Sequence, residues 1–547
     1  MELSYSHGTS ATPLLGETIG ENLRRIAGRF PDSEALVDVP PGRRWTYQQL
    51  DADTDALARG LLAAGIAARD RVGIWAPNCG EWVLLQFATA KIGAILVNIN
   101  PAYRSHELAY VLRQARVRLL VSAESFKTSD YRAMVDEVRG DLPGLERVIY
   151  LGTPDWAEMA AGSGTGTEGG ALAQREAELA FDDPINIQYT SGTTGFPKGA
   201  TLSHHNILNN GFFIGEMCHY TEYDRICIPV PFYHCFGMVL GNLAAITHGS
   251  CIVIPAPGFE PAATLRAAQN ERCTSLYGVP TMFIAELALP DFAAYDLSTL
   301  RTGIMAGSPC PVEVMKRVMS EMHMSEVTIA YGMTETSPVS CQTRPDDDTE
   351  RRVATVGRVH PHVEVKIINP DNGLVLPRGE PGEMCTRGYS VMLGYWDEPD
   401  KTAEAVDAGR WMHTGDLAVM DAAGYLNIVG RIKDMVIRGG ENVYPREVEE
   451  FLYTHPAIED VQVIGVPDQK YGEELCAWVK PRPGAGLTAD EVRAYCQGKI
   501  AHYKVPRYVH FTDAFPMTVT GKVQKYKMRE ASIADLGLEA ASQTRTA

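Results

Sequence analysis

The chain has 547 residues, of which 45% are hydrophobic and 22% are charged, an ordinary balance for a globular protein of about three or four domains. Its formal net charge of -18 argues against a general binder of nucleic acid or of anionic membranes, since both require a positive field. A single nucleotide is not excluded, because a few local donors and a metal ion are enough to bind it.

Cysteine spacing and hydropathy favour a cytoplasmic protein without an integral membrane segment. The eleven cysteines are odd in number and form no Cys-x-x-Cys pair, which fits neither a disulfide framework nor a zinc site. Cys227 and Cys251 lie in apolar stretches and are expected to be small buried hydrophobes. We expect no signal peptide and no membrane helix. The most apolar candidate, residues 82–97, is instead predicted to form a helix followed by a strand.

From the N-terminus onward, short β-branched runs alternate with longer amphipathic ones. Helices are expected over residues 81–91 and 105–115. A stretch rich in Gly, Ser and Thr, residues 160–170, predicts an exposed loop. The expected strands are 71–75, 95–99, 117–121, 147–151, 251–254, 274–277 and 327–330. This alternation predicts an α/β fold of layered subdomains with largely parallel sheets.

The pattern changes twice towards the C-terminus. Strand-like pieces between Gly and Pro turns predict an antiparallel, β-barrel-like section over residues 363–430. A compact α+β pattern follows, with Thr488 as a helix N-cap. Its expected helices are 445–453 and 488–499, and its expected strands are 461–466 and 475–479. We therefore predict a large N-terminal domain, 1–432, and a small C-terminal domain, 433–547.

The most informative stretch is the loop over residues 189–199, between a predicted strand at 185–189 and a predicted helix at 205–213 that Ser203 would cap. Its three glycines allow backbone N–H groups to face phosphate oxygens, its hydroxyls add donors, and Lys198 adds a positive charge. The predicted phosphate-binding residues are Thr190, Ser191, Gly192, Thr193, Thr194, Gly195 and Lys198. Gly follows the lysine here, which disfavours the common P-loop. The alternative of a flexible surface loop is disfavoured by the hydroxyls and the lysine.

This loop resembles the signature of the adenylate-forming superfamily, which includes acyl-CoA synthetases, luciferases and the adenylation domains of peptide synthetases. The likeness covers roughly residues 19–527 and continues through further motifs in the expected order. The chain looks most like bacterial medium-chain fatty acyl-CoA synthetases. The resemblance implies that the small C-terminal domain is mobile.

A second motif, residues 331–335, follows a predicted strand. An aromatic ring can stack on adenine, and a carboxylate can hold Mg²⁺ through its oxygens. The resemblance assigns these roles to Tyr331 and Glu335, and places Thr334 near the α-phosphate; the alternative is a strand end with a solvated Glu. The nucleotide is also expected to contact Gly332 and Met333 of this motif. It is further expected to contact Gly307 and Ser308, which belong to another segment that resembles one beside the adenine in this superfamily.

Two further motifs supply charged groups. A carboxylate accepts two hydrogen bonds, which matches the two ribose hydroxyls. The resemblance implies that Asp416 anchors the ribose and that Arg431 lies near the ribose and the phosphates. It also identifies Lys522 as the adenylation lysine, whose ammonium stabilises the charge that gathers in the transition state.

The segment over residues 231–237 resembles the one beside the substrate carboxylate. His234 would donate a hydrogen bond to the acid, although a satisfied core histidine remains an alternative. Amino-acid-activating relatives often carry Asp after the aromatic residue of this motif. His234 follows Tyr233 here, which favours an acid without an amino group. The predicted acyl pocket consists of His234, Phe236, Gly237, Met238 and Met305.

The resemblance implies a two-step reaction. The carboxylate attacks the α-phosphorus of Mg-ATP and expels pyrophosphate. The C-terminal domain then rotates about the hinge residue Lys433 and admits coenzyme A, which releases AMP. Gly439, Gly440 and Glu441 are expected to line the coenzyme A channel. The residues assigned to catalysis are Lys522, Thr334, Glu335 and His234.

The sequence thus predicts an ATP-dependent ligase that joins a medium-chain fatty acid to coenzyme A through an acyl-AMP, with Mg²⁺. It leaves open an acyl-AMP ligase that loads a carrier protein and an enzyme that activates aryl acids or amino acids. A non-catalytic nucleotide or lipid sensor is disfavoured by Lys198, Glu335, Asp416 and Lys522. The sequence does not decide whether the protein is a homodimer.

Overall fold

The computed structural model describes residues 2–162, 170–190, 197–308, 310–432, 434–438, 441–468, 470–497, 499–517 and 523–538, with residues 441 and 442 described by their backbone alone. The chain divides into two compact units. The first, unit 1, comprises Met1–Tyr5, Lys366–Cys385 and Thr414–Ala547. The second, unit 2, comprises Ser6–Val365 and Thr386–His413.

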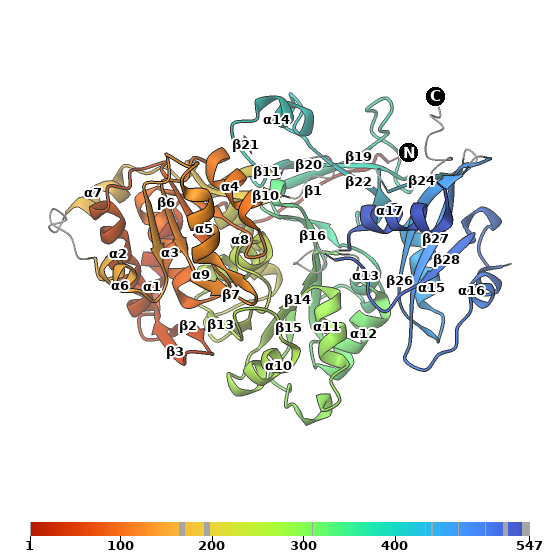
Figure 1. The fold of residues 1–547 in the computed structure, drawn as a ribbon, viewed down its shortest axis with the longest axis horizontal. Helices are drawn as coiled ribbons and strands as arrows, with labels where there is room; N and C mark the ends of the chain where they lie inside the picture. Colours follow the sequence, from red (N-terminus) through yellow and green to blue (C-terminus); the bar gives the residue numbers. More distant parts are fainter. Residues whose placement is uncertain are drawn as a thin grey trace. The chain divides into compact units, whose positions relative to one another are not determined.

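One sheet of unit 2 has seven strands, in the order β21 (Gly394–Tyr395), β11 (Lys198–Ser203), β10 (Pro184–Thr190), β5 (Ile95–Asn98), β4 (Arg71–Trp75), β6 (Leu119–Ser122) and β9 (Arg147–Tyr150). The strands from β10 to β9 are parallel, whereas β11 pairs antiparallel with both β10 and β21. Figure 1 shows β21, β11 and β10 next to one another. The strands predicted in this part of the sequence are confirmed to within about two residues, the usual uncertainty of a strand boundary.

A second sheet of unit 2 has nine strands, in the order β18 (Arg358–Val359), β17 (Val339–Gln342), β16 (Glu326–Gly332), β15 (Thr302–Ala306), β14 (Ser275–Gly278), β12 (Arg225–Cys227), β13 (Cys251–Ile254), β2 (Glu34–Asp38) and β3 (Arg43–Thr46). Its central strands are parallel. All four residues of β13 are buried, as is typical of a strand covered on both faces. The prediction of layered, largely parallel sheets is confirmed, and so is the burial of Cys227 and Cys251.

The apolar stretch at residues 82–97 folds as a helix followed by a strand, as predicted. Helix α3 spans Gly80–Ile92 and ends at Gly93, whose φ of 70° is the left-handed conformation that glycine adopts without a Cβ clash. Strand β5 begins two residues later. None of the described helices combines the length and the apolar character that a membrane span requires.

The section that was predicted to be antiparallel supplies four strands of a five-stranded sheet, and β1 from the N-terminus supplies the fifth. Its order is β1 (Tyr5–His7), β19 (Val363–Ile368), β20 (Gly382–Gly388), β22 (Met412–Met420) and β23 (Leu426–Arg431). Strands β22 and β23 pair antiparallel. It also contains helix α14, Pro399–Ala405, which the sequence analysis did not expect. Pro399 stands at the first turn of this helix, where its missing N–H costs no hydrogen bond.

The C-terminal part of unit 1 is an α+β arrangement, as predicted. Its sheet has the order β25 (Glu441–Val443), β24 (Val436–Arg438), β27 (Gly472–Pro481) and β26 (Ile458–Asp468), and β28 (Tyr508–Phe511) also pairs with β27. Helix α15 (Pro445–Tyr453) has the predicted bounds, whereas α16 (Ala489–Cys496) ends three residues before the predicted end at 499. Thr488 caps α16, since its side chain accepts a hydrogen bond from the backbone N–H of Glu491.

Candidate nucleotide site

The predicted phosphate loop connects β10 to β11, and its two ends lie side by side. Thr190 is the register partner of Lys198, and the Thr190 Oγ1 lies 3.4 Å from the Lys198 carbonyl oxygen. Of the residues predicted for this loop, Ser191, Gly192, Thr193, Thr194 and Gly195 lie outside the described residues. The sequence analysis missed β11, although Gly-Ala-Thr-Leu-Ser alternates in polarity as a strand does.

Helix α8, His204–Met217, begins directly after β11. Ser203 caps it as predicted: the Ser203 Oγ accepts a hydrogen bond from the Asn206 N–H at 3.1 Å, and Asn206 Oδ1 accepts one from the Ser203 N–H at 2.8 Å. This reciprocal pair satisfies two backbone donors at the helix start. The loop is therefore followed by a short strand and a well-capped helix.

Glu335, the predicted metal ligand, is held beside the start of this loop. It lies in the short helix Thr334–Thr336 that follows β16, and only 5% of its surface is exposed. Its Oε1 accepts hydrogen bonds from the hydroxyls of Thr190, at 3.4 Å, and Tyr395, at 2.8 Å. Two predicted site residues, Thr190 and Glu335, are thus in direct contact.

The chain around Glu335 requires glycine at position 332. A Cβ on Gly332 would lie 1.6 Å from the carbonyl oxygen of Pro338, a distance that no side chain tolerates. Tyr331, the predicted adenine partner, is half-buried, whereas Thr334 is buried. The close approach of these two backbone segments therefore fixes the turn that carries Thr334 and Glu335.

Gly307 and Ser308 follow β15, which pairs in parallel with β16, and Ala306 is the register partner of Ala330. Ligands in α/β folds commonly bind at the carboxyl ends of parallel strands. Gly307 has a φ of 88°, in the left-handed region. Gly307 follows the last residue of β15 and Tyr331 is the next to last residue of β16, so the two lie at the same edge of the sheet.

Tyr395 belongs to this site, although the sequence analysis did not single it out. The Lys198 Nζ lies 4.2 Å from the centroid of the Tyr395 ring, within the range of a cation–π interaction. Burial, with the neighbouring Glu335 charge as the next cause, raises the pKa of the Tyr395 hydroxyl. The residue stands 197 positions beyond Lys198 in the chain, so no local spacing connected the two.

The predicted acyl segment forms a π-helix, Phe236–Leu243, a geometry that is common at functional sites. Phe236 and Met238 are buried, and the Phe236 ring stacks on Tyr277 with centroids 5.7 Å apart. A Cβ on Gly237 would lie 2.3 Å from the carbonyl oxygen of Pro231, so the chain requires glycine there. The segment is thus packed tightly against the chain that precedes it.

The other two residues of the predicted pocket lie differently. His234 is exposed, and its Nδ1 accepts a hydrogen bond from the Phe236 N–H at 3.4 Å. Met305 is buried in another hydrophobic cluster, with Leu276 and Phe283, and not in the cluster that holds Phe236. The structure therefore does not bring Met305 together with the rest of the predicted acyl pocket.

Two buried amide side chains, those of Gln188 and Asn98, form hydrogen bonds with the acyl segment, and the sequence analysis missed them. The Met238 sulfur accepts hydrogen bonds from Gln188 Nε2 at 3.0 Å and Asn98 Nδ2 at 3.1 Å. Gln188 Oε1 in turn accepts one from the Cys235 thiol at 3.1 Å, and burial raises the pKa of that thiol. Gln188 and Asn98 each stand within a predicted strand, but their inward direction could not be read from residue type.

In unit 1, the predicted ribose anchor meets its predicted partner. Asp416 on β22 is the register partner of Arg431 on β23, and Arg431 Nε lies 3.1 Å from Asp416 Oδ1. The Asp416 side chain is 14% exposed and that of Arg431 is 44% exposed. The pair can therefore present both a carboxylate and a cation to a ligand.

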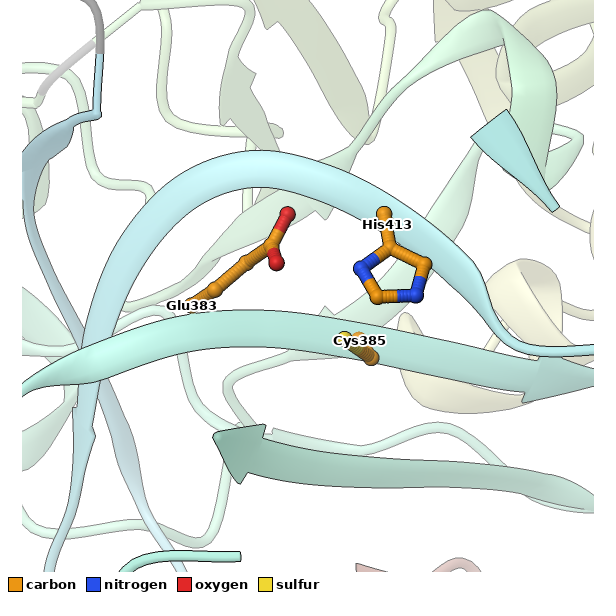
Figure 2. A group of neighbouring side chains, drawn as sticks. All are labelled: Glu383, Cys385 and His413. Atoms are coloured by element: carbon orange, nitrogen blue, oxygen red, sulfur yellow. The ribbon is translucent and has the colours of Figure 1, made fainter. Parts of the chain in front are cut away.

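The sequence analysis missed Glu383, which supports the turn before Asp416. Figure 2 shows Glu383 and Cys385, two positions apart on β20, and His413 on β22. A carboxylate, a thiol and an imidazole are all candidate metal ligands. Glu383, however, is buried, and its Oε1 accepts a hydrogen bond from the Gly415 N–H at 3.2 Å. We therefore assign Glu383 to holding the turn.

Several predicted residues cannot be placed. Lys522, Lys433, Gly439, Gly440 and the side chain of Glu441 lie outside the described residues. A cavity of about 600 Å³ opens in unit 2 between α1 (Ile19–Arg29), α8 and α9 (Ala244–His248). None of the predicted site residues that the structure describes lines this cavity, so we do not connect it with the reaction.

Comparisons with known proteins agree over nearly the whole chain. Residues 23–396 match the AMP-binding enzyme family, and residues 447–522 match the AMP-binding enzyme C-terminal domain. The chain is 51% identical to the putative acyl-CoA synthetase YngI of Bacillus subtilis (strain 168), over 95% of this chain and 98% of that protein. It is 46% identical to the mitochondrial medium-chain acyl-CoA ligase ACSF2 of Danio rerio, over 98% of this chain and 91% of that protein.

A solved structure extends this likeness to the fold. The crystal structure of the anthranilate CoA ligase AuaEII in complex with anthranoyl-AMP superimposes with a TM-score of 0.86 at 28% identity. The alignment covers 96% of this chain and 99% of that one. The resemblance to adenylate-forming enzymes is thereby confirmed: the chain belongs to the AMP-binding enzyme family.

Proposed function

We propose that this protein joins a medium-chain fatty acid to coenzyme A through an acyl-AMP, with release of AMP and pyrophosphate. The observation that carries the proposal is the likeness, over nearly the whole chain, to the acyl-CoA synthetase YngI and to the medium-chain acyl-CoA ligase ACSF2. ATP-dependent formation of an acyl-adenylate and its ligation to coenzyme A follow from the family. ATP, Mg²⁺ and coenzyme A are accordingly its cofactor and co-substrates.

The residues at the phosphate loop fit the first step. The side chains of Glu335, Thr190 and Thr334 offer oxygen atoms, the ligands that Mg²⁺ prefers. Glu335 is the residue that would hold the ion. The bound ion would supply charge neutralisation on the triphosphate. Lys198 provides a positive charge for the distal phosphates, and Asp416 accepts hydrogen bonds from the ribose hydroxyls.

Lys522 is proposed to stabilise the transition state of adenylation through its positive charge. For the second step, we propose that a C-terminal domain of residues 433–547 rotates about Lys433 relative to residues 1–432. The rotation withdraws Lys522 and brings Gly439, Gly440 and Glu441 to the channel for coenzyme A. Paired glycines permit close approach of the pantetheine arm to the backbone.

The acyl segment supports an apolar acid. Its residues Phe236 and Met238 are buried. The neighbouring amides of Gln188 and Asn98 are occupied by hydrogen bonds with the Met238 sulfur and the Cys235 thiol. No carboxylate follows Tyr233 to pair with an α-amino group. His234 remains the proposed donor to the substrate carboxylate, and its exposure is compatible with that role.

The test is a panel of acids, scored by AMP production that depends on coenzyme A. We expect the highest kcat/KM for straight-chain acids of about six to twelve carbons, because each methylene in an apolar pocket contributes about 1–3 kcal/mol. The likeness to the anthranilate CoA ligase AuaEII supports a second candidate, an aryl-acid ligase. A maximum for benzoate or anthranilate would favour that candidate and contradict the first.

Two further proposals concern the acceptor of the acyl group and the cellular compartment of the protein. We propose free coenzyme A as the acceptor, in the cytoplasm; acylation of a carrier protein without coenzyme A would contradict this. Light scattering of the purified protein decides between a monomer and a homodimer.

A further inference from the structure

Tyr395 lies between the two oppositely charged groups of the phosphate site. Its ring centroid is 4.2 Å from the Lys198 Nζ, and its hydroxyl is 2.8 Å from Glu335 Oε1. Only 6% of the tyrosine is exposed. One buried side chain therefore contacts both the proposed phosphate-binding lysine and the proposed Mg²⁺ ligand.

The backbone around Tyr395 is tied to the same two segments. Strand β21 pairs with β11, and the Trp396 N–H donates to the Gly199 carbonyl oxygen at 2.7 Å. Two residues before β21, the Met392 N–H donates to the Glu335 carbonyl oxygen at 2.9 Å. Tyr395 is thus carried by a segment that is fixed both to the end of the phosphate loop and to the turn of Glu335.

The hydrogen bonds of Glu335 are unevenly divided between its two oxygens. Within the part of the chain that the structure describes, the carboxylate accepts from Tyr395 and Thr190, and both bonds go to Oε1. The Tyr395 hydroxyl is the donor of the shorter of these two bonds, at 2.8 Å. This arrangement orients the plane of the carboxylate and leaves Oε2 as the oxygen for a cation.

We propose that Tyr395 is a positioning residue for the adenylation step. Its hydroxyl orients the Glu335 carboxylate for Mg²⁺, and its ring holds the Lys198 ammonium at the end of the phosphate loop. The proposal rests on the proposed function in two respects, the assignment of Glu335 to Mg²⁺ and that of Lys198 to the phosphates. It links the metal ligand and the phosphate loop, which are also joined through the Thr190 hydroxyl.

The first experiment measures metal binding rather than turnover. Mn²⁺ replaces Mg²⁺, and its binding to the complex of protein and ATP is followed by electron paramagnetic resonance. Tyr395→Phe keeps the ring and removes the hydroxyl, so we expect about tenfold weaker Mn²⁺ binding, as for loss of a hydrogen bond to a charged group. Binding of ATP without metal should be unchanged, because the ring still faces Lys198. Unchanged Mn²⁺ affinity in Tyr395→Phe would overturn the proposal.

A matched control is Tyr389→Phe. Tyr389 is on the same segment, and its hydroxyl accepts a hydrogen bond at 3.4 Å from Asn210 rather than donating to Glu335. We expect Mn²⁺ affinity in this variant to equal that of the unmodified protein. A tenfold loss in both variants would show a general effect of removing a buried hydroxyl and would also overturn the proposal.

The second experiment separates the two contacts of Tyr395. Tyr395→Leu removes the ring as well, so metal-free ATP should bind about threefold more weakly than to Tyr395→Phe, in line with a cation–π contact. In both variants, pyrophosphate exchange should fall while thioester formation from a supplied acyl-AMP is retained. Equal loss in both half-reactions would contradict a positioning role in adenylation. Absence of exchange with any acid in the unmodified protein would instead refute the proposed function, and the Mn²⁺ measurement would still decide the role of Tyr395.

Discussion

Asp416 and Arg431 face each other across two adjacent strands, with Arg431 Nε 3.1 Å from Asp416 Oδ1. The arginine holds one oxygen of the carboxylate and thereby orients the group that we assign to the ribose. Asp416→Asn removes the charge and one acceptor, so we expect ATP to bind about tenfold more weakly, as for loss of a charged hydrogen bond. Calorimetry with ATP measures this directly.

The same variant tests the ribose assignment more sharply. ATP lacking the 2′- or 3′-hydroxyl should bind more weakly than ATP to the unmodified protein, and this difference should shrink in Asp416→Asn, as in a double-mutant cycle. Asp421→Asn is the control, because Asp421 is an exposed residue of the same unit whose Oδ1 accepts turn hydrogen bonds that Asn can also accept. If Asp416→Asn left the discrimination unchanged, the ribose would be bound elsewhere.

Lys522→Ala should block adenylation and spare thioester formation from a supplied acyl-adenylate. Removing a charge that acts in the transition state should cost about 10²–10³ in the rate of pyrophosphate exchange, by analogy with loss of one oxyanion-hole donor. Lys527→Ala removes an exposed positive charge five residues further along and should leave both steps unchanged. Equal losses in the two steps of Lys522→Ala would contradict the alternation of domains.

The elements and the site were predictable from the sequence to different degrees. Strand and helix periodicity is local, and it located β13, α15 and the cap at Thr488 to within a residue. The contact of Thr190 with Glu335 depends instead on the strand order of two sheets, which only the tertiary structure provides.

The sequence does not reveal contacts between residues that are far apart in the chain. Tyr395 reaches Glu335 from 60 positions away, and Glu383 holds the N–H of Gly415 from 32 positions away. Neither residue belongs to a local motif whose chemistry predicts these contacts. Met305 shows the opposite error. The sequence analysis placed it in the acyl pocket, but its side chain packs in a different core cluster from that of Phe236 and Met238.

Gly237→Ala should disturb the acyl segment. The added Cβ would lie 2.3 Å from the carbonyl oxygen of Pro231 and 2.8 Å from the Cα of Phe232, so the backbone must shift. We expect a loss of stability of about 1–3 kcal/mol, typical of overpacking, and a lower kcat/KM for the acid with ATP binding preserved. Gly28→Ala is the control, since its Cβ would meet no atom within 4 Å in α1, and it should be neutral or slightly stabilising. Preserved acid kinetics in Gly237→Ala would separate this segment from the acyl pocket.

His204 should make the protein less stable in mild acid. It is fully buried at the start of α8, and its Nδ1 accepts a hydrogen bond from the Ile19 N–H at 3.1 Å, which requires an unprotonated nitrogen. Burial lowers its pKa to about 4 from an ordinary value of 6.5, with the charge of Asp183 opposing the shift. Above pH 6.5 the histidine is neutral in both the folded and the unfolded chain. As the pH falls from 6.5 towards 4, only the unfolded chain takes up the proton, so stability is lost on acidification.

The expected size of this effect is about 2 kcal/mol between pH 7.5 and pH 5, since each unit of pKa difference corresponds to about 1.4 kcal/mol. His204→Asn keeps an acceptor near the Nδ1 position without a titrating group, so urea unfolding of this variant should lose about 2 kcal/mol less stability than the unmodified protein over the same interval. His219→Asn is the matched control: His219 is exposed and has a φ of 53°, a conformation that Asn tolerates well, so this variant should follow the unmodified protein. If His204→Asn showed the same pH dependence as the unmodified protein, the acid sensitivity would belong to other groups and the burial of a neutral His204 would not contribute to it.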